Sequence, residues 1–403
     1  MSPFDFSAND EHRRKRVALV LAGGAARGAY EVGVVSYVLE EVSRALGREV
    51  PLDILCGTSV GALNVSALAA FADEPRGRAQ RLVDVWRALR VGDLVRPDLR
   101  GLLAGSRALL DTSGLERLVA DRIPFARIGD NLARGLVSAV TISTTHVASG
   151  KTVVFVQRAE TSFVRWSHEP TIEPRMAILT ENHALASAAI PILFRPVLID
   201  GQYHCDGGLR QNVPLSPARR LGADGLLIVN PRHFRDPGEA LPADEPRPGP
   251  LLLFGKALNS LLLDRIDTDV SRLEGINRLL AAGTRRYGPG FVDAINAEMG
   301  RNAPPKIRPL RTILVRASDD IGKIASEFVR SPRFEGRVSG ALARVMRRLA
   351  ETDGDSESDL LSYVLFDGDF AGELIDLGRR DAKSRHEELC AFFEAMWTRD
   401  SLV

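Results

Sequence analysis

Along the first part of the chain, the spacing of apolar residues switches between the pattern of a buried strand and the pattern of a helix. Short apolar runs that fit buried strands are each followed by a Gly-rich turn and a stretch without proline that fits a helix. The predicted strands are Val17–Ala22 and Leu52–Cys56, and the predicted helices are Tyr30–Leu46 and Ala62–Phe71. Two such strand-turn-helix units predict an α/β fold with a mostly parallel central sheet and helices on both faces.

Two hairpins are predicted further along. Leu136–Ser143 and Thr152–Gln157 flank the turn Ser149-Gly150, and Val197–Ile199 and Gln202–Cys205 flank the turn Asp200-Gly201. Asp-Gly is a strong signal for a two-residue hairpin turn. The second hairpin leads into Asp206-Gly207-Gly208 after a predicted helix at Glu181–Ala189, and Leu226–Asn230 is one more short apolar strand.

The composition changes after residue 234. Five prolines lie among acids and glycines between Arg235 and Pro250, which indicates a linker or a long surface excursion. Beyond it the pattern predicts a helix over Leu251–Leu280, a strand at Thr312–Arg316, helices at Gly340–Leu349 and Leu360–Phe366, and an exposed acidic loop at Glu351–Asp359. We therefore expect a polar extension (1–16), a catalytic domain (17–219), a last strand with the linker (220–250) and a helix-rich C-terminal region (251–403).

Composition narrows the function classes. The 403 residues carry 53 basic and 52 acidic side chains, and 45% are hydrophobic, which is typical of a globular protein and argues against disorder or nucleic-acid binding. The three cysteines, Cys56, Cys205 and Cys390, are far apart and show no metal-ligand spacing, so we expect no disulfide framework and no structural metal. No uninterrupted apolar run reaches about 18 residues, so we expect a cytoplasmic protein, with a membrane surface still within reach.

A G-x-S-x-G pentapeptide is the sharpest chemical signal. Gly57-Thr58-Ser59-Val60-Gly61 lies between a predicted strand and a predicted helix. A serine on such a turn projects from the edge of the sheet, and the strand and helix backbones approach too closely for a Cβ two residues to either side. The pattern predicts that Ser59 is a nucleophile.

Two further motifs complement this serine. Gly23-Gly24-Ala25-Ala26-Arg27-Gly28 follows the first strand and opens a helix, but it fits neither a dinucleotide fingerprint nor a Walker loop. Backbone N–H groups at such a helix start suit a developing oxyanion. Asp206, at a strand end, is a candidate base, although Asp-Gly by itself is more often only a turn.

Together these motifs resemble the patatin-like phospholipase family. The resemblance rests on the Gly-rich loop, the G-x-S-x-G turn and Asp206-Gly207-Gly208 in this order, together with Ala186-Ser187-Ala188-Ala189-Ile190-Pro191, Phe194 and Pro196. It covers about Val17 to Arg219. It implies a three-layer α/β/α fold and a serine acyl hydrolase that acts on a lipid ester through an acyl-serine intermediate, without metal or cofactor.

The resemblance also assigns roles to residues. Ser59 would be the nucleophile, Asp206 its base, and the amides of Gly23, Gly24, Ala25 and Ala26 the oxyanion hole, with Arg27 fixing that loop and Gly28 closing it. Gly57, Gly61, Gly207 and Gly208 would support the two motifs. The family pattern has Gly at the position of Ala25, so either φ stays negative there or the hole is slightly altered.

Other readings stay open. A Ser–Asp–His esterase, thioesterase or acyltransferase would use a histidine after Asp206, which leaves His233 and His386, with His233 better placed. His146, His168, His183 and His204 are expected to be structural or exposed. A silent lipid- or protein-binding module is an alternative outside enzymes.

The apolar stretch Leu251–Leu263, which includes Phe254, could reach a membrane surface or cover the mouth of the active site. It could equally pack on the main domain or form a homodimer seam.

Overall fold

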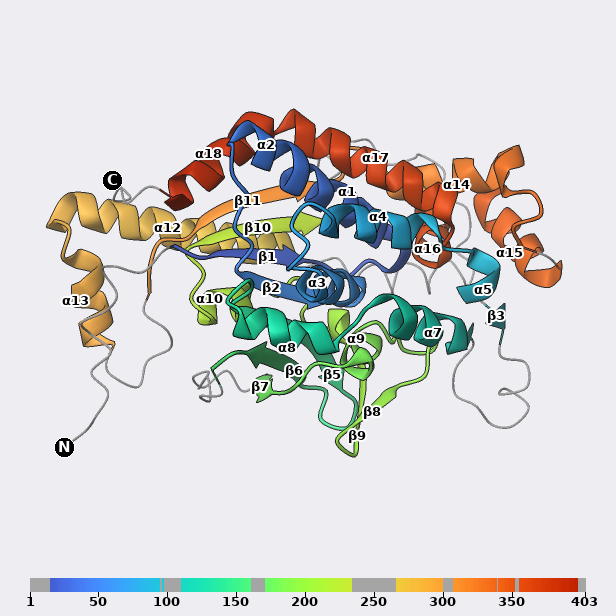
Figure 1. The fold of residues 1–403 in the computed structure, drawn as a ribbon, viewed down its shortest axis with the longest axis horizontal. Coiled ribbons are helices and arrows are strands. Elements are labelled where there is room, and N and C mark those ends of the chain that lie inside the picture. Colours follow the sequence, from blue (N-terminus) through green and yellow to red (C-terminus); the bar gives the residue numbers. More distant parts are fainter. Residues whose placement is uncertain are drawn as a thin grey trace, which may run out of the picture.

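A nine-stranded sheet forms the centre of the protein, for which a computed structural model describes residues 15–94, 96–97, 110–160, 171–233, 266–299, 307–338, 340–351 and 355–397. Its main path runs β11-β10-β1-β2-β5-β6-β7, and the hairpin β8-β9 joins it through β5 (Figure 1). The strands are β1 Val17–Leu21, β2 Ile54–Thr58, β5 Ala139–His146, β6 Thr152–Arg158, β7 Ile172–Met176, β8 Val197–Ile199, β9 Gln202–Asp206, β10 Gly225–Asn230 and β11 Arg311–Arg316. Two short strands, β3 Arg96–Pro97 and β4 Leu110–Asp111, pair separately.

Most of the sheet is parallel. The pairs β11/β10, β10/β1, β1/β2 and β2/β5 are parallel, whereas β6 and β9 both run antiparallel to β5. This confirms the predicted α/β class. Both predicted hairpins are present, and the turn of the second has Asp200 at φ 48° and Gly201 at φ 76°, the left-handed pair that matches strand twist.

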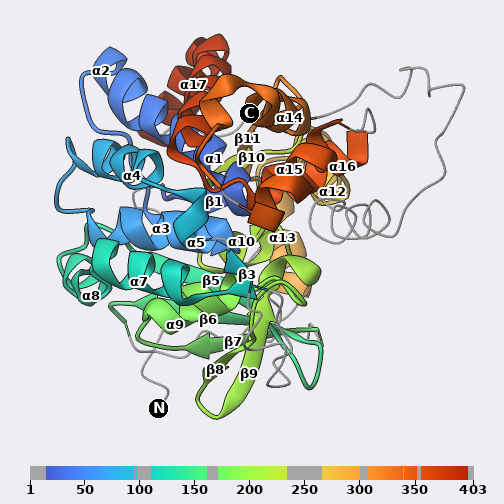
Figure 2. The ribbon, with the colours of Figure 1, turned by 90° about the vertical axis from the view of Figure 1, so that its right-hand side faces the viewer.

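Helices cover both faces of the sheet. Along β1, Val17, Leu19 and Leu21 pack into one core, and Ala18 and Val20 pack into the other, as the two-residue period of a strand requires. Figure 2 shows α3 and α4 on one side of the strands and α12 on the other. The first face carries α1 Gly28–Tyr37, α3 Val60–Ala70, α4 Arg78–Arg87, α8 Ala126–Ala133, α9 Glu181–Ser187, α14 Ile321–Arg330, α17 Gly368–Ser384 and α18 His386–Trp397, and the second carries α10 Leu215–Arg220 and α12 Ile266–Tyr287.

The remaining helices are short or lie at the periphery. They are η1 Ala25–Arg27, the π-helix η2 Val38–Val42, α2 Ser43–Ala45, α5 Val91–Leu94, α7 Ser113–Arg122, η3 Gly207–Leu209, α13 Phe291–Glu298, η4 Pro332–Phe334, α15 Gly340–Glu351 and α16 Asp355–Val364. The predicted helix Tyr30–Leu46 thus consists of α1, η2 and α2 in succession.

The predicted acidic loop Glu351–Asp359 is wrong over its second half. Asp355 to Asp359 form the first turns of α16. Acidic and serine side chains stabilise a helix N-terminus, because they accept from its unpaired N–H groups and oppose its dipole, so the same composition fits a helix start. The predicted linker at 235–250 and the apolar stretch Leu251–Leu263 lie outside the described residues.

The C-terminal helices pack directly on the N-terminal unit. Helix α17 lies along α1, although the two are more than 300 residues apart in sequence (Figure 1). The helices touch through glycines, since a Cβ on Gly33 would lie 2.1 Å from the Ile375 oxygen and one on Gly378 would lie 2.2 Å from the Tyr30 oxygen. The Tyr30 hydroxyl donates to Asp381 at 3.0 Å, which fixes the register of the pair.

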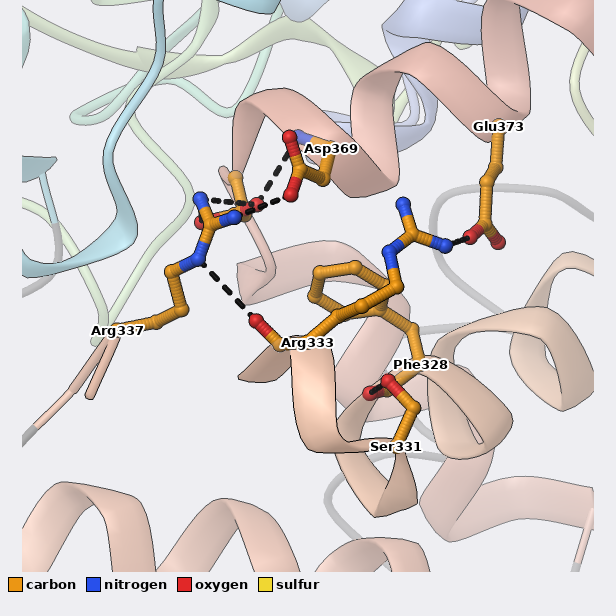
Figure 3. Close-up of polar contacts among 7 residues, drawn as sticks. Phe328, Ser331, Arg333, Arg337, Asp369 and Glu373 are labelled. Atoms are coloured by element: carbon orange, nitrogen blue, oxygen red, sulfur yellow. Dashed lines mark hydrogen bonds and ion pairs between the residues drawn. The ribbon is translucent and has the colours of Figure 1, made fainter. Parts of the chain in front are cut away.

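An ion-pair cluster fixes the start of α17 (Figure 3). Asp367 is fully buried and accepts at 3.0 Å from the backbone N–H of Asp369, which caps the helix. Arg337 pairs with the carboxylates of Asp367, at 3.3 Å, and of Asp369. Arg333 pairs with Glu373. Because a buried carboxylate needs a counter-charge, Arg337 stabilises the buried cap.

The Gly33 contact generates the first prediction. Gly33→Ala should lower the free energy of unfolding by about 1–3 kcal/mol, because the new methyl group meets backbone that cannot move aside. Gly275 on α12 is the matched control, because a Cβ there meets nothing within 4 Å. Gly275→Ala should be stabilising by about 0.5–1 kcal/mol. Urea unfolding measures both; equal effects from the two variants would contradict the close approach of α1 and α17.

Candidate active site

Ser59 occupies a sharp turn between β2 and α3. Its backbone has φ 54° and ψ −127°, a conformation that side-chain-bearing residues rarely adopt outside functional sites. A Cβ on Gly57 would lie 2.3 Å from the Gly61 oxygen, and one on Gly61 would lie 2.6 Å from the Leu21 oxygen. The spacing that the motif predicts is therefore a steric requirement of this turn.

Strand β5 brings Asp206 to Ser59. Thr58, the last residue of β2, pairs with Ser143, and Asp206, the last residue of β9, pairs with Thr144. Because β2 is parallel and β9 antiparallel to β5, the two strands approach one another end to end along it. The Ser59 Oγ donates to Asp206 Oδ2 at 2.7 Å.

The Asp206 carboxylate is buried, with none of its surface exposed. Burial raises its pKa to about 7, while hydrogen bonds from the Ser59 hydroxyl and the Gly208 N–H lower it in part. The Gly208 N–H reaches Oδ1 at 2.7 Å. A carboxylate with a pKa near neutrality is a much better match for a general base than an exposed aspartate.

The Gly-rich loop runs against the nucleophile. A Cβ on Gly23 would lie 2.9 Å from the Ser59 Cβ. The Gly23 N–H donates to Asn212, at 2.9 Å to Oδ1 and 3.2 Å to the backbone oxygen. Among the described residues, the N–H groups of Gly24, Ala25 and Ala26 have no acceptor, so they are the donors of this loop that remain available. Ala25 to Arg27 form η1.

Gly28 ends the loop, and a Cβ there would lie 2.6 Å from a Val60 methyl, so it allows α1 to approach α3.

Ala25 takes the left-handed conformation, with φ 49°. This conformation costs a non-glycine residue about 1–2 kcal/mol. The side chain is 5% exposed and packs in a small apolar cluster with Ile190, Phe194 and Tyr363. The alternative that φ stays negative at Ala25 is therefore wrong, and burial of the methyl group offsets part of the cost of the positive φ.

Arg27 connects the loop to the C-terminal region. It is 3% exposed, its Nε donates to the Ser362 Oγ at 2.7 Å, and its guanidinium lies 4.3 Å from the centre of the Tyr363 ring. Both partners belong to α16. The sequence predicts a helix at Leu360–Phe366 but offers no signal that links it to Arg27.

Ser187 is a site residue whose role the sequence analysis missed. Its Oγ accepts from the Ser59 backbone N–H at 2.8 Å and donates to the Ser143 oxygen at 2.6 Å. The side chain lies at the end of α9 and is fully buried. It therefore fixes the nucleophile turn to β5, and it occupies the Ser59 N–H, which leaves the oxyanion to other donors.

The candidate histidines lie elsewhere. The His233 ring contacts the Ala317 oxygen at 3.2 Å, and the His386 ring contacts the Tyr37 hydroxyl at 3.1 Å. His183 caps α9, His204 is buried against Thr144, and His146 contacts Ser149, whereas His168 lies outside the described residues. In the described part of the chain, no histidine is hydrogen-bonded to Ser59 or Asp206.

The described residues contain no group of three or more His, Cys, Asp or Glu side chains that could hold a metal ion. Within the same ranges, no helix is both long and apolar enough to cross a bilayer.

A family model described as patatin-like phospholipase matches residues 19–219, the segment that contains all three motifs. The chain belongs to the patatin-like phospholipase family. Three relatives are each similar to about half of this chain.

A cGAMP-activated phospholipase of Pseudomonas aeruginosa is 31% identical over 199 residues, which cover 49% of this chain and 53% of that protein. The uncharacterized protein YjjU of Escherichia coli is 29% identical, covering 53% and 51%. Lysophospholipase nte1 of Aspergillus terreus is 28% identical, covering 55% and 12%. The match thus spans about half the length of the first two relatives and less of the third.

Among solved structures, VipD from Legionella pneumophila is similar over 90% of this chain and 67% of that chain, at 13% identity and a TM-score of 0.32.

Ser187 generates the second prediction. Ser187→Ala leaves the buried Ser59 N–H without an acceptor, which should cost about 1–3 kcal/mol of stability. Because the nucleophile turn loses its tie to β5, kcat on an ester should also fall by about tenfold or more, with KM nearly unchanged. Steady-state kinetics on the folded variant measures kcat and KM separately.

Ser66 supplies the control for this experiment. It is also a fully buried serine, but its hydroxyl donates only to the Ala62 oxygen of its own helix, at 2.7 Å. Ser66→Ala should change stability by no more than about 0.5 kcal/mol and leave kcat unchanged. An undiminished kcat in Ser187→Ala would contradict the positioning role.

The buried carboxylate generates the third prediction. The Asp206 pKa is about 7 in the folded chain and about 3.9 in an unfolded one. The folded state therefore binds an extra proton between these values, and the stability that Asp206 contributes is full below about pH 4 and lost as the pH rises through about 7.

In Asp206→Asn, the loss of unfolding free energy with rising pH is absent, because the amide does not titrate. Relative to wild type, the variant should gain about 3 kcal/mol in unfolding free energy between pH 4.5 and pH 8. Urea titrations at the two pH values measure the change, and Asp293→Asn, on exposed α13, should show no such gain. A variant that is destabilised more at pH 8 than at pH 4.5 would overturn the assignment of a raised pKa.

Proposed function

We propose that the protein is a serine lipid acyl hydrolase, similar to phospholipase A or a lysophospholipase, that uses Ser59 and Asp206 as a catalytic dyad. Membership of the patatin-like phospholipase family supports a lipid hydrolase, and two of the three relatives above are named phospholipases. The observation that carries the proposal is the 2.7 Å hydrogen bond from the Ser59 hydroxyl to a buried carboxylate.

The acylation step uses the dyad as nucleophile and base. Asp206 takes the hydroxyl proton while the Ser59 Oγ forms a bond to the ester carbonyl carbon. The carbonyl oxygen becomes an oxyanion, which the N–H groups of Gly24 and Ala25 stabilise. As the tetrahedral intermediate collapses, the C–O bond to the alcohol breaks and Asp206 returns the proton to the leaving oxygen.

Deacylation repeats the sequence with water. Asp206 removes a proton from water, whose oxygen attacks the acyl-serine carbonyl carbon. Collapse breaks the bond to the Ser59 Oγ, which recovers the proton from Asp206. The products are a carboxylic acid and the free enzyme, and neither step draws on a metal or cofactor.

A small apolar pocket, of about 50 Å³, lies beside the turn that carries Ser59. It begins at Val60, the residue after Ser59, and lies between α3, α4 and α7. Its walls include Leu63, Trp86, Leu118 and Phe366. We assign the acyl chain to this side of the nucleophile because burial of each methylene is favourable by about 0.8 kcal/mol.

Contact with a membrane surface, a cytoplasmic location and self-association remain predictions. The stretch Leu251–Leu263, on which the first of them rests, lies outside the described residues.

The fourth prediction tests the dyad. Ser59→Ala and Asp206→Asn should lose at least about 1000-fold in kcat on a p-nitrophenyl ester and a fluorogenic phospholipid, because each removes one half of the dyad. His233→Ala should keep wild-type rates. The wild-type rate should rise with pH around pH 7, where the Asp206 carboxylate loses its proton. Circular dichroism checks that each variant is folded.

Outcomes of the same experiment separate the alternatives. Loss of activity in His233→Ala with activity retained in Asp206→Asn would replace the dyad by a Ser–Asp–His triad. A fluorophosphonate probe labels only an activated serine, so a folded wild type that is neither labelled nor active would indicate a silent binding module. Labelling without hydrolysis, together with transfer to an added alcohol, would indicate an acyltransferase.

A further inference from the structure

A second pocket, of about 370 Å³, lies on the opposite face of the sheet, between α10 and α12. Its buried lining includes the apolar side chains of Leu226, Leu273 and Leu310. Its size is within the range of sites that take small molecules. The acyl pocket described above lies on the other face and shares no lining residue with it.

Positive charge dominates the polar rim of this pocket. Arg210, Arg219 and Arg272 line it, against the single carboxylate of Asp269. Among the described residues, the guanidinium groups of Arg210 and Arg272 form no ion pair or hydrogen bond. Guanidinium groups bind anionic oxygens in a bidentate geometry, so those of Arg210 and Arg272 favour an anionic ligand over a neutral one, and a phosphate group can carry more negative charge than a carboxylate.

The pocket is connected to the oxyanion loop through one residue. Asn212 lines the pocket, and its side-chain and backbone oxygens both accept from the Gly23 N–H. Its Nδ2 also donates to the Gly23 oxygen, at 3.4 Å. Arg210 lies two residues before Asn212, so an anion held by the Arg210 guanidinium would restrain the segment that positions Gly23.

We propose that this pocket binds a phosphate-bearing small molecule, and that binding activates the Ser59–Asp206 site by ordering Asn212 and Gly23. The ligand combines a phosphate with an apolar body, since the rim is basic and the buried lining includes apolar side chains. The binding part stands by itself, and the activation part rests on the proposed function. Preorganised donors lower the barrier more than mobile ones, so ordering should raise kcat.

Calorimetric titration of the full chain tests binding. Pyrophosphate should bind with one ligand per chain, and affinity should fall as salt rises from 50 to 300 mM. Arg272→Gln should weaken binding by about tenfold or more. Arg278→Gln is the matched control, because Arg278 is exposed on the same helix and does not line the pocket, so it should bind like wild type.

A second arm identifies the source of the phosphate. Monomeric dihexanoyl phosphatidic acid and glycerol 3-phosphate are titrated in the same way. Tighter Arg272-dependent binding of phosphatidic acid identifies a lipid headgroup, and tighter binding of glycerol 3-phosphate identifies a free metabolite. If none of the three probes binds, or if Arg272→Gln binds them as wild type does, the site is overturned.

Activity on p-nitrophenyl butyrate tests activation. This ester carries no phosphate, so the added anion cannot act as part of the substrate. Saturating pyrophosphate should raise kcat by about threefold or more in wild type and in Arg278→Gln, but not in Arg272→Gln. An unchanged or lower kcat at saturation would overturn the activation.

Binding is also measured with Ser59→Ala, which needs no activity. Intact binding by a chain that never hydrolyses esters would show that the proposed function fails while the site stands. Hydrolysis without binding would show the reverse.

Discussion

The active site depends on one constraint, that two strands end on neighbouring residues of β5. Ser143 pairs with the end of β2 and Thr144 with the end of β9, so Ser59 and Asp206 meet without a long side chain to bridge them. Ser187 adds a third tie, because it bonds both the Ser143 oxygen and the Ser59 N–H. A dyad with a short acid needs this closeness, since an aspartate reaches less far than a histidine.

The same arrangement is unfavourable in free energy at the site itself, and other parts of the fold must offset this. Ser59 and Ala25 both have positive φ values, and Asp206 is fully buried. Such strain and buried charge persist only where the surroundings over-determine the conformation. Here the close approach of Gly23 and Gly61 to neighbouring atoms, the cluster around Ala25 and the N–H of Gly208 serve that purpose.

Local signals in the sequence predicted the elements that form the site, but not the contacts between distant elements. The strands before Ser59 and Asp206, the turn glycines and the fold class follow from periodicity and turn chemistry, which act over a few residues. The hydrogen bond between Ser187 and Ser59 joins residues 128 positions apart, and the one between Arg27 and Ser362 joins residues 335 positions apart. Neither contact can be recognised from the spacing of residues in the sequence. Likewise, acidic residues at Asp355–Asp359 fit a loop and a helix start equally well until packing decides.

The Gly-rich loop, which we propose to hold the oxyanion, is supported from outside the family segment. Residues 19–219 contain every motif, yet Arg27 is held by Ser362 and Tyr363, and α17 packs along the helix that the loop begins. Strand β11 also extends the sheet beyond β10. The proposed oxyanion donors lie within one turn of Arg27, so the contacts of Arg27 with α16 support the segment that carries them. The part of the chain outside residues 19–219 therefore contributes to the support of the proposed site.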